Sequence, residues 1–290
     1  MPATAERVLP RVVSVPVQAP APVPDPLAGW RVHDEPYYRP VGSEVAAFEA
    51  AASARLPVLL TGPTGCGKTR FVEHMAWRLG RPLVTVACHE DLGAADLAGR
   101  WLLDADGTRW QDGPLALAAR HGALCYLDEL AEARSDALVV VHPLADTRRA
   151  LPLERRSELL QAHPGFLLVA SCNPGYRGLH RQLKPSTRQR FTSLAFDYPE
   201  AEAEAAIVAQ EGGVLPELAA RLVALAQRTR RLQDAGLEEG ASTRLLVHAA
   251  QLVRAGLPPR AACLQAVAAP LSDDPDLAAV LRGLVHASFA

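Results

Sequence analysis

The chain has 290 residues, of which 49% are hydrophobic and 21% are charged, and its formal net charge is −2. These values indicate a soluble globular protein that is long enough to bury a sizeable core. The near-neutral charge and the absence of Lys/Arg-rich runs disfavour a nucleic-acid-binding protein that relies on a broad basic face. No apolar run approaches the ~20 residues of a membrane-spanning helix, so we expect no direct membrane insertion.

Residues 1–31 are rich in proline and lack the uninterrupted apolar segment of a signal peptide. We therefore predict a disordered, proline-rich tail at this end of the chain. The five cysteines form no C-x-x-C pair, which favours reduced thiols in a cytoplasmic protein.

Residues 62–69 match the pattern G-x-x-x-x-G-K-[ST]. The glycines let backbone N–H groups surround a β-phosphate, Lys68 reaches the β- and γ-phosphates, and the Thr69 hydroxyl can ligate Mg²⁺. An apolar strand precedes the motif and helical apolar spacing follows it, which disfavours a glycine-rich turn without a ligand. The residues predicted to bind the nucleotide are Gly62, Pro63, Thr64, Gly65, Cys66, Gly67, Lys68 and Thr69.

Cys66 lies at a helix N-terminus, where a thiolate is favoured. An inert thiol beside the phosphates is the alternative that we prefer.

Residues 82–88, 123–129 and 166–172 are further apolar runs that predict buried parallel strands. Between the first two, residues 100–111 contain Asp106-Gly107 flanked by two Trp-bearing arms, a pattern typical of a β-hairpin. Its two indoles, Trp101 and Trp110, could be exposed or could pack on one another. Residues 148–163 form a second insertion, either a hairpin or a helix.

The strand at 123–129 ends in two carboxylates, Asp128 and Glu129. Because ligands bind beyond the carboxyl ends of parallel strands, both side chains should lie on the rim that carries the phosphate loop. Asp128 would hold Mg²⁺ through its water shell, and Glu129 would polarise the attacking water. Asn173 ends the neighbouring strand and could orient the same water, although an Asx-turn is the alternative.

Two arginines, Arg188 and Arg190, precede the predicted last core strand, 193–196. Neither is easily placed beside its own phosphate loop, so we expect one of them to act on a neighbouring subunit's nucleotide. A solvated helix end is the alternative. From residue 199 onward the pattern predicts only helices, and Arg244 opens one of them, where it could sense the nucleotide or be an ordinary surface charge.

Together these residues resemble the AAA+ ATPases of the MoxR class, and residues 62–73, 106–115 and 184–191 resemble the CbbQ/NirQ/NorQ branch. The resemblance implies an α/β fold: a P-loop (ASCE, AAA+) parallel sheet flanked by helices, with a C-terminal all-α lid. The AAA+ domain would span 32–198, with the two insertions, and the lid would span 199–290. Asn173 corresponds to sensor 1 of the family, and Arg244 corresponds to sensor 2.

The resemblance also implies a homo-hexameric ring in which ATP and Mg²⁺ lie between subunits, with Arg190 favoured over Arg188 as the arginine supplied in trans. The hairpin at 100–111 would face the central pore. Such motors work with a von Willebrand factor A-domain adaptor on a metalloenzyme client, either Rubisco or nitric oxide reductase. The sequence does not identify the client.

Two other functions are compatible with a phosphate loop alone. One is a small-molecule kinase, which transfers the phosphoryl group to a substrate and not to water. The other is a nucleotide-gated binding module with little turnover. The adjacent carboxylates at 128–129 and the helical lid favour hydrolysis.

Overall fold

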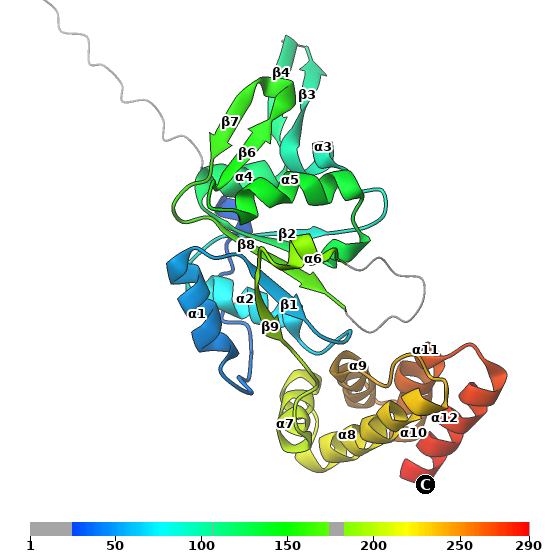
Figure 1. Cartoon of the computed structure of the whole chain (residues 1–290). Helices are drawn as coiled ribbons and strands as arrows, with labels where there is room; N and C mark the ends of the chain where they lie inside the picture. The colour runs from blue at the N-terminus through cyan, green and yellow to red at the C-terminus, as the bar shows by residue number, and fades with distance from the viewer. Residues whose placement is uncertain (1–24, 106, 174–182, 290) are drawn as a thin grey trace, which may run out of the picture.

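The structure, a computed structural model, describes residues 25–105, 107–173 and 183–289 and contains a five-stranded parallel sheet. The strand order is β2-β5-β8-β1-β9, and every ladder between these neighbours is parallel (Figure 1). The predicted parallel sheet is therefore confirmed. The strands are β1 (Val58–Thr61), β2 (Leu83–Ala87), β5 (Leu124–Asp128), β8 (Leu167–Cys172) and β9 (Thr192–Ala195).

Helices cover both faces of the sheet. Successive residues of a strand point to opposite faces, so Leu124 and Tyr126 join one core while Cys125 and Leu127 join the other. Burial on both faces explains why the strands are continuous apolar runs. The first core includes α1 (Glu44–Ala54) and α2 (Lys68–Arg78), and the second includes α3 (Ala94–Ala98), α4 (Pro114–His121) and α5 (Ser135–Ala145).

The described residues begin at residue 25, before the predicted start of the AAA+ domain at residue 32. Residues Ala28–Trp30 form a short 3₁₀ helix, and Leu27 is buried in the core at 3% exposure. The Asp25 side chain accepts a hydrogen bond from the Leu27 amide at 3.0 Å, a local turn that a proline-rich composition does not reveal. The rest of the predicted tail, residues 1–24, lies outside the described residues.

Both insertions are β-hairpins, and they stand side by side on one side of the sheet (Figure 1). The first pairs β3 (Gly99–Asp104) with β4 (Gly107–Asp112), and the second pairs β6 (Ala150–Leu153) with β7 (Glu158–Gln161). Trp101 faces Trp110 across the first hairpin, with ring centroids 5.5 Å apart, yet it remains 49% exposed. Both arrangements considered for the indoles therefore occur together.

Side chains of described residues connect the two hairpins. Arg120 of α4 donates to Asp112 of the first hairpin and to Glu158 of the second, each at 2.7 Å. Farther along, the Trp101 indole donates to the Arg155 carbonyl at 2.9 Å. The guanidinium of Arg120 therefore acts as a clamp between the base of the first hairpin and the turn end of the second.

We expect Arg120→Ala to lower the free energy of unfolding by about 2 kcal/mol, because it removes hydrogen bonds between charged groups. Arg134→Ala is the control: its ion pair with Asp136 is exposed on both sides, and its loss should change stability by less than ~0.5 kcal/mol. Urea denaturation of both variants measures the difference. Equal stabilities would contradict the clamp.

The clamp also predicts a pH dependence. The hydrogen bond from Arg120 lowers the pKa of Glu158 below its ordinary 4.5, so the folded state favours the ionised carboxylate. This stabilisation is fully present above pH 4.5 and is lost as the pH falls through the lowered folded-state pKa. In Arg120→Ala the acid-induced loss of stability should therefore be smaller.

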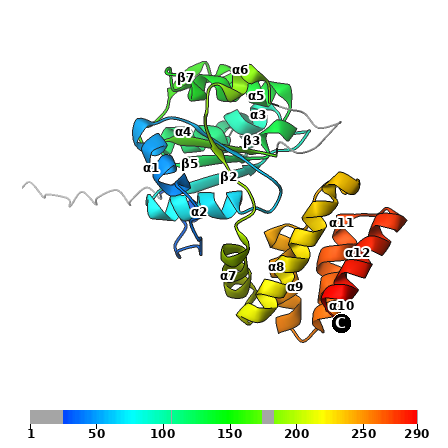
Figure 2. The same cartoon turned by 60° about the horizontal axis from the view of Figure 1, so that its bottom comes forward.

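The C-terminal helices form a separate layered group with a core of their own (Figure 2). We call this group the lid. It comprises α7 (Ala201–Gly212), α8 (Pro216–Arg230), α9 (Thr243–Arg254), α10 (Pro259–Cys263), a π-helical turn (Leu264–Ala268), α11 (Ala269–Leu271) and α12 (Pro275–Ser288). A 3₁₀ helix, Arg231–Ala235, follows α8 within the lid. Outside the lid, the described short helices not yet given are Leu130–Glu132, Glu154–Arg156 and α6 (Pro185–Arg188).

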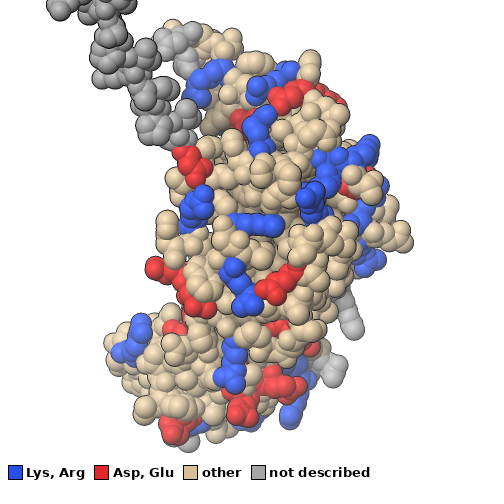
Figure 3. All heavy atoms as spheres, turned by 90° about the vertical axis from the view of Figure 1, so that its left-hand side faces the viewer, with Lys and Arg blue, Asp and Glu red and all other residues tan. Residues whose placement is uncertain are grey.

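Charged groups of both signs are mixed on one face of the molecule (Figure 3). On the face drawn in Figure 3, acidic and basic side chains are interspersed, and no continuous basic stripe crosses it. Among the described residues, no helix combines the length and the apolar character needed to cross a membrane.

Candidate functional site

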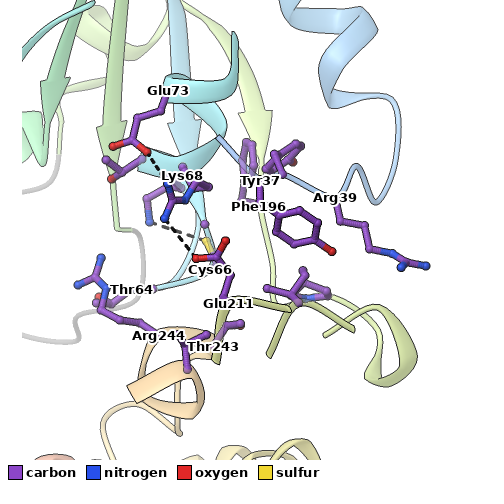
Figure 4. Close-up of a pocket in the computed structure, with 18 of the residues that line it drawn as sticks. Tyr37, Arg39, Thr64, Cys66, Lys68, Glu73, Phe196, Glu211, Thr243 and Arg244 are labelled. Atoms are coloured by element: carbon purple, nitrogen blue, oxygen red, sulfur yellow. Dashed lines mark hydrogen bonds and ion pairs between the residues drawn. The ribbon is translucent and has the colours of Figure 1, made fainter. Parts of the chain in front are cut away.

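A cleft of about 430 Å³ lies between the carboxyl ends of the strands and the lid. The phosphate loop, the end of β5, Asn173 and the start of α9 all contribute to its lining. Figure 4 shows Lys68 and Cys66 on the side of the sheet, with Thr243 and Arg244 on the side of the lid. The segments that the sequence singled out separately thus meet in one place.

The phosphate loop curls around the Lys68 ammonium. Gly65 and Gly67 have φ values of +68° and +102°, a left-handed backbone that glycine adopts without strain. The Lys68 Nζ donates to the carbonyls of Gly62 and Pro63, each at 2.8 Å, and to the Asn173 Oδ1 at 2.7 Å. A cation therefore lies at the N-terminal end of α2, where a phosphate group would be bound.

Asp128 is held by two hydroxyl groups. Its Oδ1 accepts hydrogen bonds from Tyr126 and Ser171, each at 2.6 Å, while its Oδ2 lies 3.5 Å from the Thr69 hydroxyl. Burial raises the pKa of Tyr126, and the adjacent Asp128 raises it further, so the phenol keeps the proton that it donates. Thr69 and Asp128 offer the hard oxygen ligands that Mg²⁺ prefers, and they fit a magnesium site.

Glu129 occupies an unusual backbone conformation, with φ +56° and ψ +48°. A non-glycine residue in this region costs of order 1 kcal/mol or more, and such strain concentrates at functional sites. The Glu129 amide donates to the Ser171 hydroxyl at 2.8 Å, so Ser171 supports both carboxylate residues.

The Asn173 side chain connects Lys68 to Glu129. While its Oδ1 accepts from Lys68, its Nδ2 donates to the Glu129 Oε1 at 3.2 Å and to the Thr64 Oγ1 at 3.3 Å. The amide therefore links the phosphate loop to the carboxylate that would activate water. The Asx-turn considered for Asn173 depends on residues 174 and 175, which lie outside the described part of the chain.

The Cys66 thiol is buried within the loop at 8% exposure. Burial raises the pKa of Cys66, against the opposing effect of Lys68. This environment favours the inert thiol over the reactive thiolate.

We call residues 184–191 the α6 segment; it contains Arg188, the last residue of α6, and Arg190. Neither arginine is among the described residues that line the cleft. Arg190 donates through Nε to Asp146 at 2.9 Å and through Nη1 to the Ser186 carbonyl. Its side chain remains 31% exposed. Arg188 is exposed, and its side chain makes no hydrogen bond or ion pair with another described residue. Arg190 is thus oriented in advance, whereas Arg188 is not.

Arg244 lines the cleft from the first turn of α9, close to Thr64 in Figure 4. Two further contacts join the lid side to the loop: the Tyr198 hydroxyl donates to the Thr64 carbonyl at 3.1 Å, and the Thr64 amide donates to Glu239 at 3.5 Å. The lid region therefore touches the phosphate loop directly.

Sequence reasoning missed several residues at the site. Tyr126 lies two positions before Asp128 on the same strand face, and Ser171 is a hydroxyl within an apolar run, so period-2 alternation could have identified both. Tyr37 and Phe196 line the opposite end of the cleft, as Figure 4 shows. They come from segments distant in sequence, and no local pattern indicated them.

Comparisons with known proteins agree with this geometry. Residues 57–191 match a family model described as an AAA domain of the dynein-related subfamily, and residues 204–288 match one described as CbbQ/NirQ/NorQ C-terminal. Protein CbbQ of Hydrogenophilus thermoluteolus is 56% identical over 261 residues, covering 90% of this chain and 98% of the relative. The denitrification regulatory protein NirQ of Pseudomonas aeruginosa is 60% identical over 255 residues, covering 88% and 98% of the two chains.

Protein NorQ of Paracoccus denitrificans is 57% identical over 256 residues, which cover 88% of this chain and 95% of the relative. Among solved structures, a RuvB variant from Thermotoga maritima aligns with a TM-score of 0.51 at 16% identity, covering 84% of this chain and 70% of that one. The RuvB likeness supports the fold alone.

Proposed function

Because this chain belongs to the CbbQ/NirQ/NorQ family of AAA+ proteins, we propose that it is a Mg²⁺-dependent ATPase working as a ring motor on a metalloenzyme. The observation that carries the proposal is the convergence of Lys68, Thr69, Asp128, Glu129 and Asn173 in one cleft. Each of these residues has the chemistry that phosphoryl transfer to water requires.

The proposed reaction begins with ATP in this cleft. Loop amides and Lys68 would bind its phosphates, and the aromatic end of the cleft, with Tyr37 and Phe196, would accept the base. Thr69 and Asp128 would hold Mg²⁺, which would neutralise negative charge on the phosphates. Glu129 would accept a proton from the attacking water, and Asn173, already bonded to Glu129, would orient that water.

Three described arginines line this cleft, Arg39, Arg70 and Arg244, but neither arginine of the α6 segment does. We propose that a neighbouring copy supplies Arg190 and that six copies form the ring. Preorientation by Asp146 favours Arg190 over Arg188, because little side-chain entropy remains to be lost. Arg244 would report the nucleotide to the lid.

The remaining features suit a motor. The two clamped hairpins would face the pore and contact the client, in concert with a von Willebrand factor A-domain adaptor. Relatives named for denitrification support a nitric oxide reductase client, whereas the CbbQ relative leaves Rubisco as the other candidate. A cytoplasmic location accords with reduced cysteines, all five of which are free thiols.

The test is phosphate release from ATP by the purified full chain, with and without Mg²⁺. Wild type should release phosphate only with the metal, and Lys68→Ala should abolish both binding and release, because the ammonium contacts the loop interior. Arg78→Ala is the matched control, because Arg78 is a partly exposed cation at the other end of α2 and is not among the described residues that line the cleft. A phosphorylated small molecule would indicate a kinase, and tight binding without release would indicate a binding module.

A further inference from the structure

We propose that four side chains, which we call the lid relay, position Arg244 against the phosphate loop and so couple the lid to the nucleotide. The relay consists of Tyr198, Arg230, Glu204 and Thr243. The inference rests on the proposed ATP-binding function of the cleft, and it adds residues that act on the nucleotide only through their neighbours.

The centre of the relay is a buried ion pair within the lid. Glu204 of α7 is fully buried at 0% exposure. Its carboxylate accepts hydrogen bonds from both terminal nitrogens of the Arg230 guanidinium, at 2.6 and 2.9 Å. A bidentate guanidinium–carboxylate pair has a fixed geometry, and removing one partner would leave a buried charge uncompensated. The pair is therefore a rigid reference point from which other groups can be positioned.

One end of the relay holds the turn before α9. The Thr243 hydroxyl donates to the Glu204 Oε1 at 2.7 Å, and the Arg230 Nε donates to the Ala241 carbonyl at 2.9 Å. These bonds hold Ala241 and Thr243, the residues on either side of Ser242. Thr243 directly precedes Arg244. The position of Arg244 in the cleft therefore depends on the ion pair.

The other end of the relay reaches the phosphate loop. The Arg230 guanidinium lies 3.8 Å from the centroid of the Tyr198 ring, a cation–π contact, and the Tyr198 hydroxyl donates to the Thr64 carbonyl at 3.1 Å. The start of α9 also meets the loop, because a Cβ added to Gly65 would lie 2.7 Å from Ser242. Tyr198 of the relay thus contacts Thr64, and Ser242, which directly precedes Thr243 of the relay, approaches the adjacent Gly65.

Some polar contacts of the lid outside the relay also reach the phosphate-loop side, as the Glu211–Arg70 ion pair does at 3.3 Å, but others do not. Arg221 and Arg228 bind the end of α12, through the Ser288 carbonyl and hydroxyl, and Ser288 is not among the described lining residues of the cleft. A buried ion pair is in general weak evidence for stabilisation, so its value here is geometric. The relay connects a rigid point in the lid to two contacts on the loop.

The test is a double-mutant cycle on the affinity of the full chain for ATP. Arg244→Ala should raise the Kd for ATP roughly 10- to 100-fold, as expected for a lost hydrogen bond to a charged group. Thr243→Val keeps the shape of the side chain but removes its bond to Glu204, and it should raise the Kd roughly 3- to 10-fold. Because Thr243 acts through Arg244, the double variant should bind no more weakly than Arg244→Ala alone.

Two further variants separate positioning from lid stability. Tyr198→Phe keeps the ring beneath Arg230 but removes the bond to Thr64, and it should raise the Kd for ATP by a similar factor. Ser288→Ala is the control, since it removes lid hydrogen bonds far from the relay and should lower the Tm without changing the Kd. The Tyr198 variant also keeps the test informative if Thr243→Val fails to fold.

The outcomes distinguish the relay from the proposed function. If wild type binds no ATP, the proposed function fails. If wild type binds ATP but Thr243→Val and Tyr198→Phe leave the Kd unchanged, only the relay is overturned. A Thr243→Val effect that persists in full in the Arg244→Ala background would also overturn it, because the residue would then act independently of Arg244.

Discussion

Glu129→Gln should bind ATP with near wild-type affinity and hydrolyse it about 10²- to 10⁴-fold more slowly, the usual contribution of a positioned general base. The substitution preserves the size of the side chain and the hydrogen bond that Oε1 accepts from Asn173. It removes the charge that would accept a proton from water. The loss should therefore fall on kcat and leave Kd almost unchanged.

Steady-state phosphate release and ATP binding, measured on the same preparation, give the two quantities. Glu132→Gln is a suitable control, because Glu132 lies three residues along the chain and is not among the described lining residues of the cleft. Unchanged turnover in Glu129→Gln would remove Glu129 from the mechanism. A Kd that rose as much as kcat fell would instead assign Glu129 to nucleotide binding.

Arg190→Ala should slow hydrolysis by ~10³- to 10⁵-fold if its guanidinium stabilises transition-state charge in trans. The expected loss is large because this charge develops on the transferring γ-phosphoryl group. Asp146→Asn should produce a smaller loss, since it weakens the bond that orients Arg190 but leaves the cation in place.

Arg188→Ala is the matched control for this prediction. It removes an identical charge two residues away that has no hydrogen-bond partner among the described residues. If Arg188→Ala shows the large loss and Arg190→Ala does not, the trans role belongs to Arg188. If neither variant loses activity, no α6-segment arginine completes the site.

The sequence predicted the sheet because buried parallel strands are continuous apolar runs. Three of these runs are followed directly by polar groups of the predicted site: the phosphate loop, the Asp128–Glu129 pair and Asn173. It also predicted that the Asp128–Glu129 pair and Asn173 would lie on the rim beside Lys68, since all three follow from strand direction. These residues meet in the cleft as expected. Their chemical roles stay predictions until the variants are measured.

The supporting groups could not be predicted in the same way. Tyr198, Glu204 and Arg230 approach the loop or one another only through tertiary packing of the lid, and their local sequence is that of ordinary amphipathic helices and a linker. Likewise, Arg120 has no local signal that it clamps two hairpins separated by more than 35 residues along the chain. Contacts of this kind depend on the three-dimensional fold and not on a motif.

The most direct test of the central claim, an ATP site shared between subunits, is the activity of mixed rings. We expect Lys68→Ala subunits to lose ATP binding but to keep Arg190, and Arg190→Ala subunits to bind ATP but to lack the arginine proposed to act in trans. We predict that each variant alone is inactive and that mixtures recover part of the ATPase activity at composite interfaces. Confirmed co-assembly with no recovery at any mixing ratio would contradict the shared site.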